Sequence, residues 1–449
     1  MIDLWLTQVR QKQQQQDGPA LAALLNPDPT SNSLNVLRQS LQNAPSRPAS
    51  FTSTTRAAFP DYRPLADFLA AFLLYARDAP FERTDAAGLE KQYERLEDCF
   101  KNADRLFAQG ETGWFVPTLR KLTRRLVDVA LAVGRASGDP KLTRAGEAAR
   151  LLGRPMGIAA SDRNSESPTK RDALYLLANQ TFRVYFALSN LRLCDTVLNN
   201  TANSSAVLEA FPKADQVAFL YYRGRIALYQ RRLPQARNDL RRAMGLCHAG
   251  AWKTGRLILI HLIAASLPLG FFPSPALLQH FNLSAQYSTL IPALKKGHFR
   301  AVLSCLDAHQ SFHLRTGNYL LLREKLEVVC WRNLARQTLL VTTNGSPLPP
   351  SGPPTLSLHA LLAAARIAFP PDTGGVADRN DELDVDDVEA MCAGLMEQRD
   401  FAHAVFSLPP STAQGYLKAY ILHSKRLLVL QKGERCGFPP LSSVNAVAG

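Results

Sequence analysis

The chain has 449 residues, 46% of them apolar and 20% charged, a composition that is ordinary for a folded globular protein and excludes a disordered chain. The net charge is +14, which favours phosphates, acidic proteins or anionic membrane surfaces as partners without choosing among them. The seven cysteines are scattered, so they predict neither a disulfide framework nor a paired-cysteine metal site, and they indicate reduced thiols in a cytosolic or nuclear protein.

The sequence predicts neither secretion nor a membrane span. The first residues lack the basic region followed by an apolar stretch that a secretory signal requires. The most apolar run, 257–272, contains His261 and Pro268 and is shorter than the roughly 20 residues that a membrane-spanning helix needs. We expect this run to form a buried helix.

The N-terminal part of the chain predicts a loose segment followed by helices. Residues 1–60 are rich in Gln, Pro, Ser, Thr and Asn and lack a sustained apolar period, so we expect a mobile or loosely packed segment there. From Pro64 onward, apolar residues are spaced by three and four, as on the buried face of a helix. This spacing predicts helices over 64–78, 89–107 and 114–136.

A linker and a helical-repeat region follow. Residues 153–169 are rich in Gly, Pro and Ser and predict an exposed linker, which closes an N-terminal helical region over 61–168. Helical periodicity then continues to about residue 341, with about eight helices and no strand-like alternation. We expect an irregular helical solenoid over 169–341.

One segment of this region, 219–244, matches a tetratricopeptide-type (TPR-type) helix pair. In such a pair, small residues let two antiparallel helices approach closely. Pro234 suits the first turn of the second helix, because its missing N–H is not needed there. The small and apolar positions follow Gly224 after 12, 16 and 19 residues and are Ala236, Leu240 and Ala243.

The C-terminal module, 342–449, predicts a winged helix. A Pro-rich linker over 344–355 precedes two helical segments, and the short apolar runs 416–423 and 425–433 then predict a β-hairpin. Helices followed by a hairpin are the order of a winged helix, which commonly faces a nucleic acid or a protein partner. We expect the long helix 319–340 to be the rigid bridge between the solenoid and this module.

Two basic clusters are the candidate binding sites. Arginine suits phosphate and carboxylate ligands, because its planar fork offers paired donors and stays protonated. The first cluster has nine cations against the single acid Asp239 and is predicted to bind an acidic subunit or a nucleic acid, the alternative being a solvated repeat face. Its members are Arg223, Arg225, Arg231, Arg232, Arg237, Arg241, Arg242, Lys253 and Arg256.

The second cluster lies around the predicted hairpin turn and along the long helix. It is predicted to contact nucleic-acid phosphates. The alternatives are a protein interface or simple solvation. Four members flank the turn, Lys418, His423, Lys425 and Arg426. The others are assigned to the long helix, Arg323, Lys325, Arg332 and Arg336, together with Arg315.

Catalytic and metal-binding patterns are weak. The acidic run 378–387 lacks the glycine and terminal glutamate of a calcium loop, so Asp384, Asp386 and Asp387 are interpreted as acids at a helix N-terminus. His309 and His313 have the spacing of two zinc ligands but lack the glutamate of a zinc protease, and a pair on a helix surface is expected. No phosphate-binding loop, dinucleotide or serine-hydrolase motif occurs, so we expect no cofactor, no metal and no enzymatic activity.

The order of these blocks resembles the PCI-domain proteins. The resemblance rests on residues 221–244, 256–336 and 420–441, and it runs from about residue 170 to Leu441. Within this family, the chain is similar to the branch that contains the subunit-12-like protein of the signalosome (CSN) and the PCI subunit of the nuclear-pore transcription-export (TREX) complex. The chain departs from the family pattern at 401–415, a Pro-containing insertion before the hairpin.

The resemblance implies a fold that is mainly α-helical, with a TPR-like solenoid followed by a winged helix. It also implies a non-enzymatic scaffold that pairs through its winged helix with a second PCI-domain protein and holds a small acidic subunit of the proteasome-lid or export-complex type. RNA or DNA contact in mRNA export, transcript processing or splicing is implied as well, in a nuclear protein for which an additional cytoplasmic location stays open. A signalosome-associated assembly subunit without nucleic-acid binding is the second reading.

Overall fold

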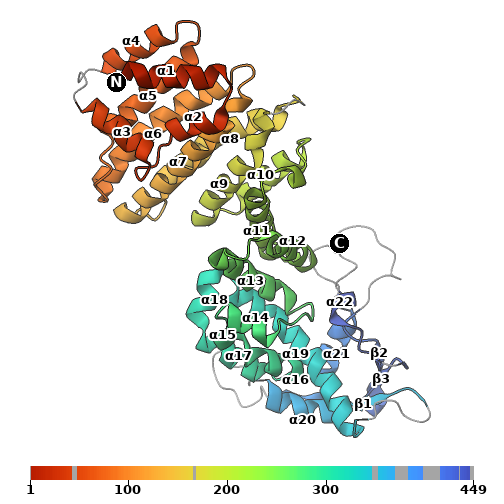
Figure 1. Ribbon diagram of the computed structural model, residues 1–449. Coiled ribbons are helices and arrows are strands. Elements are labelled where there is room, and N and C mark those ends of the chain that lie inside the picture. Colours follow the sequence, from red (N-terminus) through yellow and green to blue (C-terminus); the bar gives the residue numbers. More distant parts are fainter. Residues whose placement is uncertain are drawn as a thin grey trace. The chain divides into compact units, whose positions relative to one another are not determined.

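The computed structural model describes residues 2–42, 48–164, 168–345, 352–369, 383–397, 415–433 and 435–444. The chain divides into two compact units, Met1–Tyr222 and Arg223–Gly449 (Figure 1). Both are built mainly from α-helices, which confirms the predicted fold class. None of the helices in these described stretches is long and apolar enough to cross a membrane.

The N-terminal unit is a series of helices, in which α5, α6, α7, α8 and α9 each pack on the next along the chain (Figure 1). Each buries one apolar face between its neighbours, as the spacing of three and four requires. Three of them confirm the predicted helices. The bounds are α1 Ile2–Gln14, α2 Gly18–Leu24, α3 Asn32–Leu41, α4 Pro48–Ala58, α5 Arg63–Asp78, α6 Ala86–Phe107, α7 Val116–Ser137, α8 Thr143–Ser161, α9 Leu174–Ala187 and α10 Arg192–Ala202, followed by α11 Lys213–Tyr229, which contains the boundary between the units.

The expectation of a loosely packed segment over 1–60 is wrong for the described residues. Four helices form there, and α2 packs on α7 while α3 packs on α5. Leu34, Leu37 and Leu41 of α3 are buried, and the Tyr75 hydroxyl donates a hydrogen bond to the carbonyl of Pro27 at 2.8 Å. These helices are short and expose polar faces rich in Gln and Ser. Polar residues therefore dominate the composition of the segment, and the few buried leucines give no clear apolar period.

The linker expected over 153–169 is also wrong in its first half. Helix α8 continues through Pro155 to Ser161, and residues 165–167 lie outside the described part of the chain. The buried face of α8 is built largely from alanines, with Leu152 and Met156 among them. Small side chains give a weak apolar signal, and the prediction followed Gly and Pro instead, although Pro155 is part of the buried face and Gly153 and Gly157 lie on the exposed side of the helix.

The C-terminal unit contains the remaining helices and all strands of the described residues (Figure 1). Between 168 and 345 the chain forms eleven α-helices where about eight were expected, because short helices such as α14 and α15 interrupt the longer ones. The helices are α12 Leu233–Leu246, α13 Trp252–Ser266, α14 Pro275–His280, α15 Ser284–Tyr287, α16 Leu290–Lys296, α17 Phe299–Ala308, α18 Gln310–Thr316, α19 Tyr319–Thr342, α20 Leu358–Ala368, α21 Val385–Glu397 and α22 Leu441–Val444, and the strands are β1 Thr355–Ser357, β2 Ala419–Leu422 and β3 Leu427–Leu430.

The predicted TPR-like pair is formed by α11 and α12. A Cβ atom added at Gly224 would lie 2.6 Å from Cγ of Leu240 and 3.3 Å from the carbonyl oxygen of Ala236, so the absent side chain is what lets the helices meet. Ala236, Leu240 and Ala243 are all fully buried. Pro234 lies in the first turn of α12, as expected.

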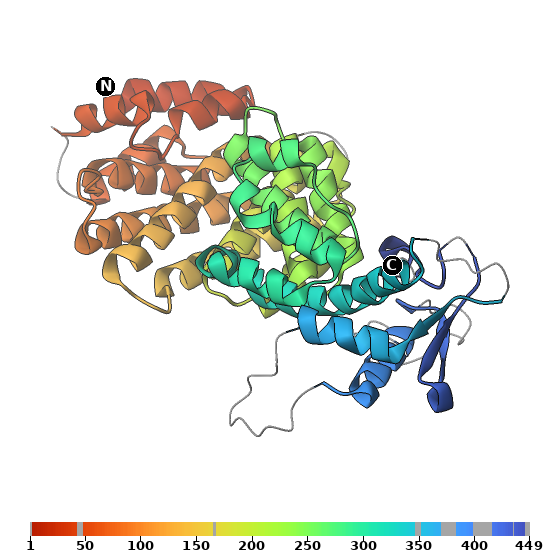
Figure 2. The same cartoon turned by 90° about the horizontal axis from the view of Figure 1, so that it is seen from below.

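The C-terminal module has the predicted winged-helix order, from α19 through β1, α20 and α21 to the hairpin β2–β3. The strands form an antiparallel sheet in the order β1-β3-β2, in which Ala419 pairs with Leu430 and Leu422 with Leu427. The hairpin was predicted, but β1 was not, because it begins at Thr355, the last residue assigned to the Pro-rich linker. The sheet lies beside α20 and α21 (Figures 1 and 2). The insertion 401–415 lies outside the described residues except for Gly415.

Helix α19 joins the winged helix to the preceding helices, as predicted. It packs on α16, α17 and α18 and also on α20 and β1. Phe369, at the end of α20, stacks on Trp331 of α19 with ring centroids 4.0 Å apart and also contacts Phe299 of α17. Arg300 of α17 donates a hydrogen bond to the carbonyl of Phe369 at 3.0 Å. The two parts of the C-terminal unit therefore share one core.

Two histidines lie inside that core. His261 of α13 faces Asn318 at 3.4 Å, and His313 of α18 is fully buried beside the ring of Tyr287. His313 is thus not part of a surface pair with His309, which lies at the junction of α17 and α18. Burial, with a smaller effect of Arg225, lowers the pKa of His261 to about 3, and burial, with a smaller effect of His309, lowers that of His313 to about 4.

We predict that Gly224→Ala destabilises the protein by about 1–2 kcal/mol, because the new methyl group overpacks the contact with Leu240. Gly245→Ala is the matched control: Gly245 lies in the partner helix α12, and a Cβ atom there would meet nothing within 4 Å. The control is expected to be neutral or to stabilise by up to about 1 kcal/mol through helix propensity. Thermal and urea unfolding measure both changes, and equal midpoints for the two variants would contradict the close-contact role of Gly224.

We predict that stability falls as the pH is lowered from 7.5 to 5. Both histidines have a folded-state pKa below the ordinary 6.5, so below pH 6.5 the unfolded chain binds protons that the folded core rejects. Each contributes a loss approaching about 1.4 kcal/mol per pH unit in this window. Urea unfolding at several pH values should show a smaller loss for His313→Phe than for the native chain. An unchanged pH dependence in this variant would refute the assignment.

Candidate nucleic-acid interface

The first basic cluster extends over three consecutive helices. Arg223 and Arg225 lie on α11, Arg231 and Arg232 in the turn that follows it, and the remainder on α12 and α13. The structure therefore brings the nine residues into neighbouring elements, but it gives them different environments. The members on the last two helices are Arg237, Arg241, Arg242, Lys253 and Arg256.

Arg223 forms an ion pair with Asp239, the single acid of the segment. Its Nε donates to Oδ2 of Asp239 at 2.8 Å and its Nη2 to Oδ1 at 2.5 Å, a two-pronged ion pair across the α11–α12 contact. Asp239 is 4% exposed, so this carboxylate is not available to neutralise the outer surface. The pair holds the helices together and leaves the surrounding cations without that counter-charge.

Three further arginines contact other parts of the C-terminal unit. Arg231 forms an ion pair with Glu324 of α19 at 2.7 Å, and Arg256 donates to the carbonyl of Phe281 at 3.0 Å. The guanidinium carbon of Arg237 lies 3.5 Å from the centroid of the Phe271 ring. Burial and, to a smaller extent, the neighbouring Arg241 lower the pKa of Arg237. These side chains are partly structural.

The exposed members of the cluster are Arg241, Arg242 and Lys253. Arg241 and Arg242 belong to α12, on which Ala236, Leu240 and Ala243 form the buried face. Arg225 and Arg232 are half-buried, and Arg232 donates a hydrogen bond to the side chain of Gln230. The surface open to a ligand is therefore smaller than the sequence cluster, and it is centred on the later part of α12 and the start of α13.

The hairpin turn of the winged helix is attached to the start of α21. Nδ1 of His423 lies 2.8 Å from Oε1 of Glu389, and Arg426 donates to Oε2 of Glu389 at 2.9 Å and to Asp386. Two of the predicted phosphate contacts are thus engaged by carboxylates. Lys425 is exposed at the turn, and Lys418 is half-buried just before β2, where its N–H donates to the carbonyl of Gly437.

The acids of α21 confirm their predicted place at a helix N-terminus. Asp386 and Asp387 lie in the first turn of α21, where negative charge favours the helix dipole. The N–H of Asp387 donates to Asp384 at 2.8 Å, and the N–H of Asp384 donates back to Asp387 at 2.9 Å. The sequence identified this role but did not predict that Asp386 and Glu389 would also anchor the hairpin.

The basic residues assigned to the long helix separate into two groups. Arg323 is exposed and Lys325 half-buried in the first half of α19, whereas Arg332 and Arg336 lie one turn apart in the second half. Arg315 belongs to α18, so its assignment to the long helix is wrong. The break at Gly317, which has a positive φ of 73°, separates these two helices.

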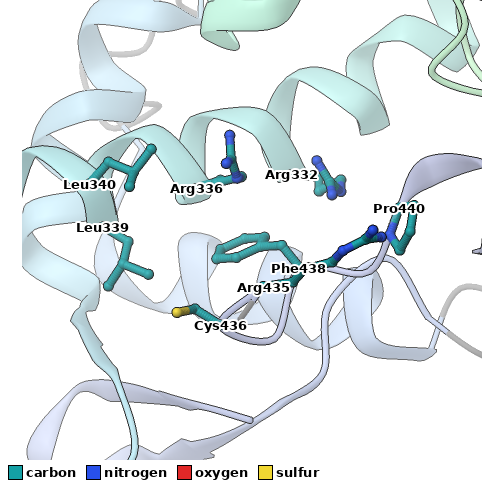
Figure 3. A pocket seen from close by; sticks show the side chains of 8 residues that line it. All are labelled: Arg332, Arg336, Leu339, Leu340, Arg435, Cys436, Phe438 and Pro440. Atoms are coloured by element: carbon teal, nitrogen blue, oxygen red, sulfur yellow. The ribbon is translucent and has the colours of Figure 1, made fainter. Parts of the chain in front are cut away.

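Arg332 and Arg336 line a pocket of about 290 Å³ between α19 and the C-terminal segment (Figure 3). From the other side the pocket is lined by Arg435, Cys436, Phe438 and Pro440, and Leu339 and Leu340 of α19 complete it. Arg435 and Phe438 escaped the sequence analysis, because they become neighbours of α19 only after the chain returns from the hairpin. The pocket therefore brings Arg332 and Arg336, which were predicted from the sequence, together with Arg435, which was not.

Arg332 is the buried wall of this pocket, with 8% of the residue exposed. It donates to Oδ1 of Asn333 at 2.9 Å and to the carbonyl of Pro439 at 2.6 Å, and its Nε has no hydrogen-bond partner within the described structure. Burial, with a smaller effect of Arg336, lowers the pKa of Arg332 to about 10. The guanidinium therefore remains charged at pH 7, at a desolvation cost that no nearby carboxylate among the described residues offsets.

Comparison with known proteins gives relatives over most of the chain, although no family model matches it. A PCI domain-containing protein of Schizosaccharomyces pombe is 29% identical over 372 residues, which cover 80% of this chain and 78% of that protein. PCI domain-containing protein 2 of Xenopus laevis is 28% identical, over 75% of this chain and 76% of its own. This chain is a PCI-domain protein.

A plant relative extends the same likeness. The enhanced ethylene response protein 5 of Arabidopsis thaliana is 27% identical to this PCI-domain protein over 77% of the chain and 75% of its own length. The likeness in each case covers most of both chains, and not only the winged helix. The solenoid-plus-winged-helix order of this PCI-domain protein therefore agrees with the resemblance inferred from its sequence.

We predict that Glu389→Gln loosens the hairpin of this PCI-domain protein, because it removes the carboxylate that contacts both His423 and Arg426. Hydrogen–deuterium exchange of the amides of β2 and β3 should become faster. Glu397→Gln, an exposed position at the other end of α21, is the matched control and should leave exchange unchanged. Equal exchange in both variants would show that the ion pairs do not hold the hairpin.

Proposed function

We propose that this PCI-domain protein is a non-enzymatic scaffold of a nuclear complex, which contacts RNA or DNA through its C-terminal unit. The observation that supports the proposal most strongly is the exposed basic surface on α12 and α13, where Arg241 and Lys253 are open to solvent while Asp239 is buried in its ion pair with Arg223. Such a surface attracts phosphates without reading sequence. Lys425, exposed on the hairpin turn, offers a further contact.

Protein partners are part of the same proposal. The winged helix is proposed to pair with a second PCI-domain protein, and the basic surface is proposed to hold a small acidic subunit where it does not hold a nucleic acid. The work of the complex is proposed to be mRNA export, transcription-coupled processing or splicing. An assembly subunit of a signalosome-like complex without nucleic-acid binding is the alternative, which the same basic surface would serve by binding carboxylates.

We predict that labelled single-stranded RNA and duplex DNA bind the full chain with an affinity that weakens steeply as salt increases, because phosphate neutralisation releases counterions. Fluorescence anisotropy across a salt series measures this dependence. Arg241→Gln should reduce the slope of log K against log salt by about one, the loss of about one phosphate contact. Lys296→Gln, which removes one exposed charge at the end of α16, is the control and should leave the slope unchanged.

The outcomes separate the two readings. Absence of binding at low salt would reject nucleic-acid contact. If a small acidic protein co-purifies with the native chain but not with Arg241→Glu, and the variant still binds RNA, the assembly role is favoured instead. Arg241 is preferable to Arg231 for this test, because reversing the charge of Arg231 would also break its ion pair with Glu324.

A further inference from the structure

The pocket between α19 and the C-terminal segment concentrates positive charge. Arg332, Arg336 and Arg435 are three of its eight lining residues, and none of the eight is acidic. Within the described residues, no carboxylate lies at ion-pair distance from any of the three. Like charges held together destabilise one another, and an anion in their midst reverses that effect. The pocket therefore has the charge of an anion site.

The depth of the three arginines indicates how an anion would enter. Arg336 and Arg435 are exposed, whereas Arg332 is buried with a free Nε–H. Figure 3 shows Arg332 and Arg336 on α19, with Arg435 and Phe438 on the neighbouring C-terminal segment. A ligand must insert an anionic end to reach Arg332, while the outer two arginines can hold its remaining oxygens. A phosphate inside a continuous strand is flanked by sugars on both sides and does not present such an end.

The chemistry of the donors favours a phosphate monoester over a carboxylate. A phosphate monoester carries about −1.5 to −2 charges at pH 7 and has three strong acceptor oxygens, whereas a carboxylate carries one charge and two oxygens. Three guanidinium groups match the former better. The volume of about 290 Å³ is close to the lower limit of pockets that bind small organic ligands, and Leu339, Leu340 and Phe438 provide an apolar wall for the group that bears the phosphate.

We infer that this pocket binds a terminal phosphate monoester, supplied by the 5′ end of a nucleic-acid strand or by a free nucleotide. The 5′-end source rests on the proposed nucleic-acid contact, because the basic surface of the same unit would hold the remainder of the strand. The phosphate would accept hydrogen bonds from Nε of Arg332 and from the guanidinium groups of Arg336 and Arg435. The binding is non-covalent and requires no metal.

We predict that a 5′-phosphorylated single-stranded RNA binds the full chain about tenfold more tightly than the same RNA with a 5′-hydroxyl, since charge-assisted hydrogen bonds to a phosphate are strong. Arg435→Gln should abolish this advantage and leave affinity for the 5′-hydroxyl RNA within about twofold of the native value. Lys296→Gln should retain the advantage. Anisotropy titrations with matched oligonucleotides measure all three.

A second variant tests the pocket without changing charge. Leu340→Trp fills the space beside the arginines and should also abolish the advantage of the 5′-phosphate. A nucleoside 5′-monophosphate should raise the melting temperature of the native chain and of Lys296→Gln but not of Arg435→Gln, because a ligand that binds only the folded state stabilises it. A thermal shift without discrimination between RNA ends would identify the free nucleotide as the source.

Equal affinity for the two RNA ends, together with no thermal shift by the monophosphate, would overturn the inference. So would a 5′-phosphate advantage that persists in both Arg435→Gln and Leu340→Trp. Salt-dependent binding of the 5′-hydroxyl RNA would still support the proposed nucleic-acid contact in either case. Conversely, a thermal shift by the monophosphate without RNA binding would retain the pocket and reject that contact.

Discussion

The C-terminal unit depends on the burial of one helix from two sides. Helix α19 is 24 residues long, about 36 Å, and it is covered by α16, α17 and α18 on one part and by α20 and β1 on another. The stacked rings of Trp331 and Phe369 close the junction between the two parts. Because the same helix completes both cores, neither the repeats nor the winged helix can pack fully without it.

The distribution of charge follows from how the helices of the C-terminal unit pack. Some cations are drawn inward as structural groups, such as Arg223 in its pair with Asp239 and Arg332 in its bond to the carbonyl of Pro439. Others, such as Arg241 and Lys253, remain outside. A net charge of +14 therefore overstates the charge that a partner meets, and its arrangement is more informative than its sum.

The sequence was sufficient to predict most long elements and the fold class, because an apolar stripe of large side chains is a local signal. It was sufficient for the α11–α12 contact as well, because Gly224 and Ala236 mark a close approach by their size. Helices with alanine-rich or sparse leucine stripes, such as α8 and α3, were missed because their burial is decided by their neighbours. Strand β1 was missed for the same reason, since its partner β3 lies far along the chain.

The candidate site was less predictable than the fold. Residue type identified the arginines, but solvent exposure and internal partners separate Arg241 from Arg231 and Arg332, and these depend on tertiary structure. The pocket could not be predicted from the sequence, because Arg435 lies about a hundred positions after the arginines of α19 with which it lines the pocket. Contacts of that kind carry no local pattern.

The packing of α12 has a consequence for how related proteins can diverge. Its inner face is fixed by Ala236, Leu240 and Ala243 against the glycine of α11, whereas Arg241 on its exposed side has no packing role. Mutations on the outer side can thus change the surface charge gradually, one residue at a time, without disturbing the packing of α12. The inner side can change only by paired substitutions that preserve the combined volume of the two helices.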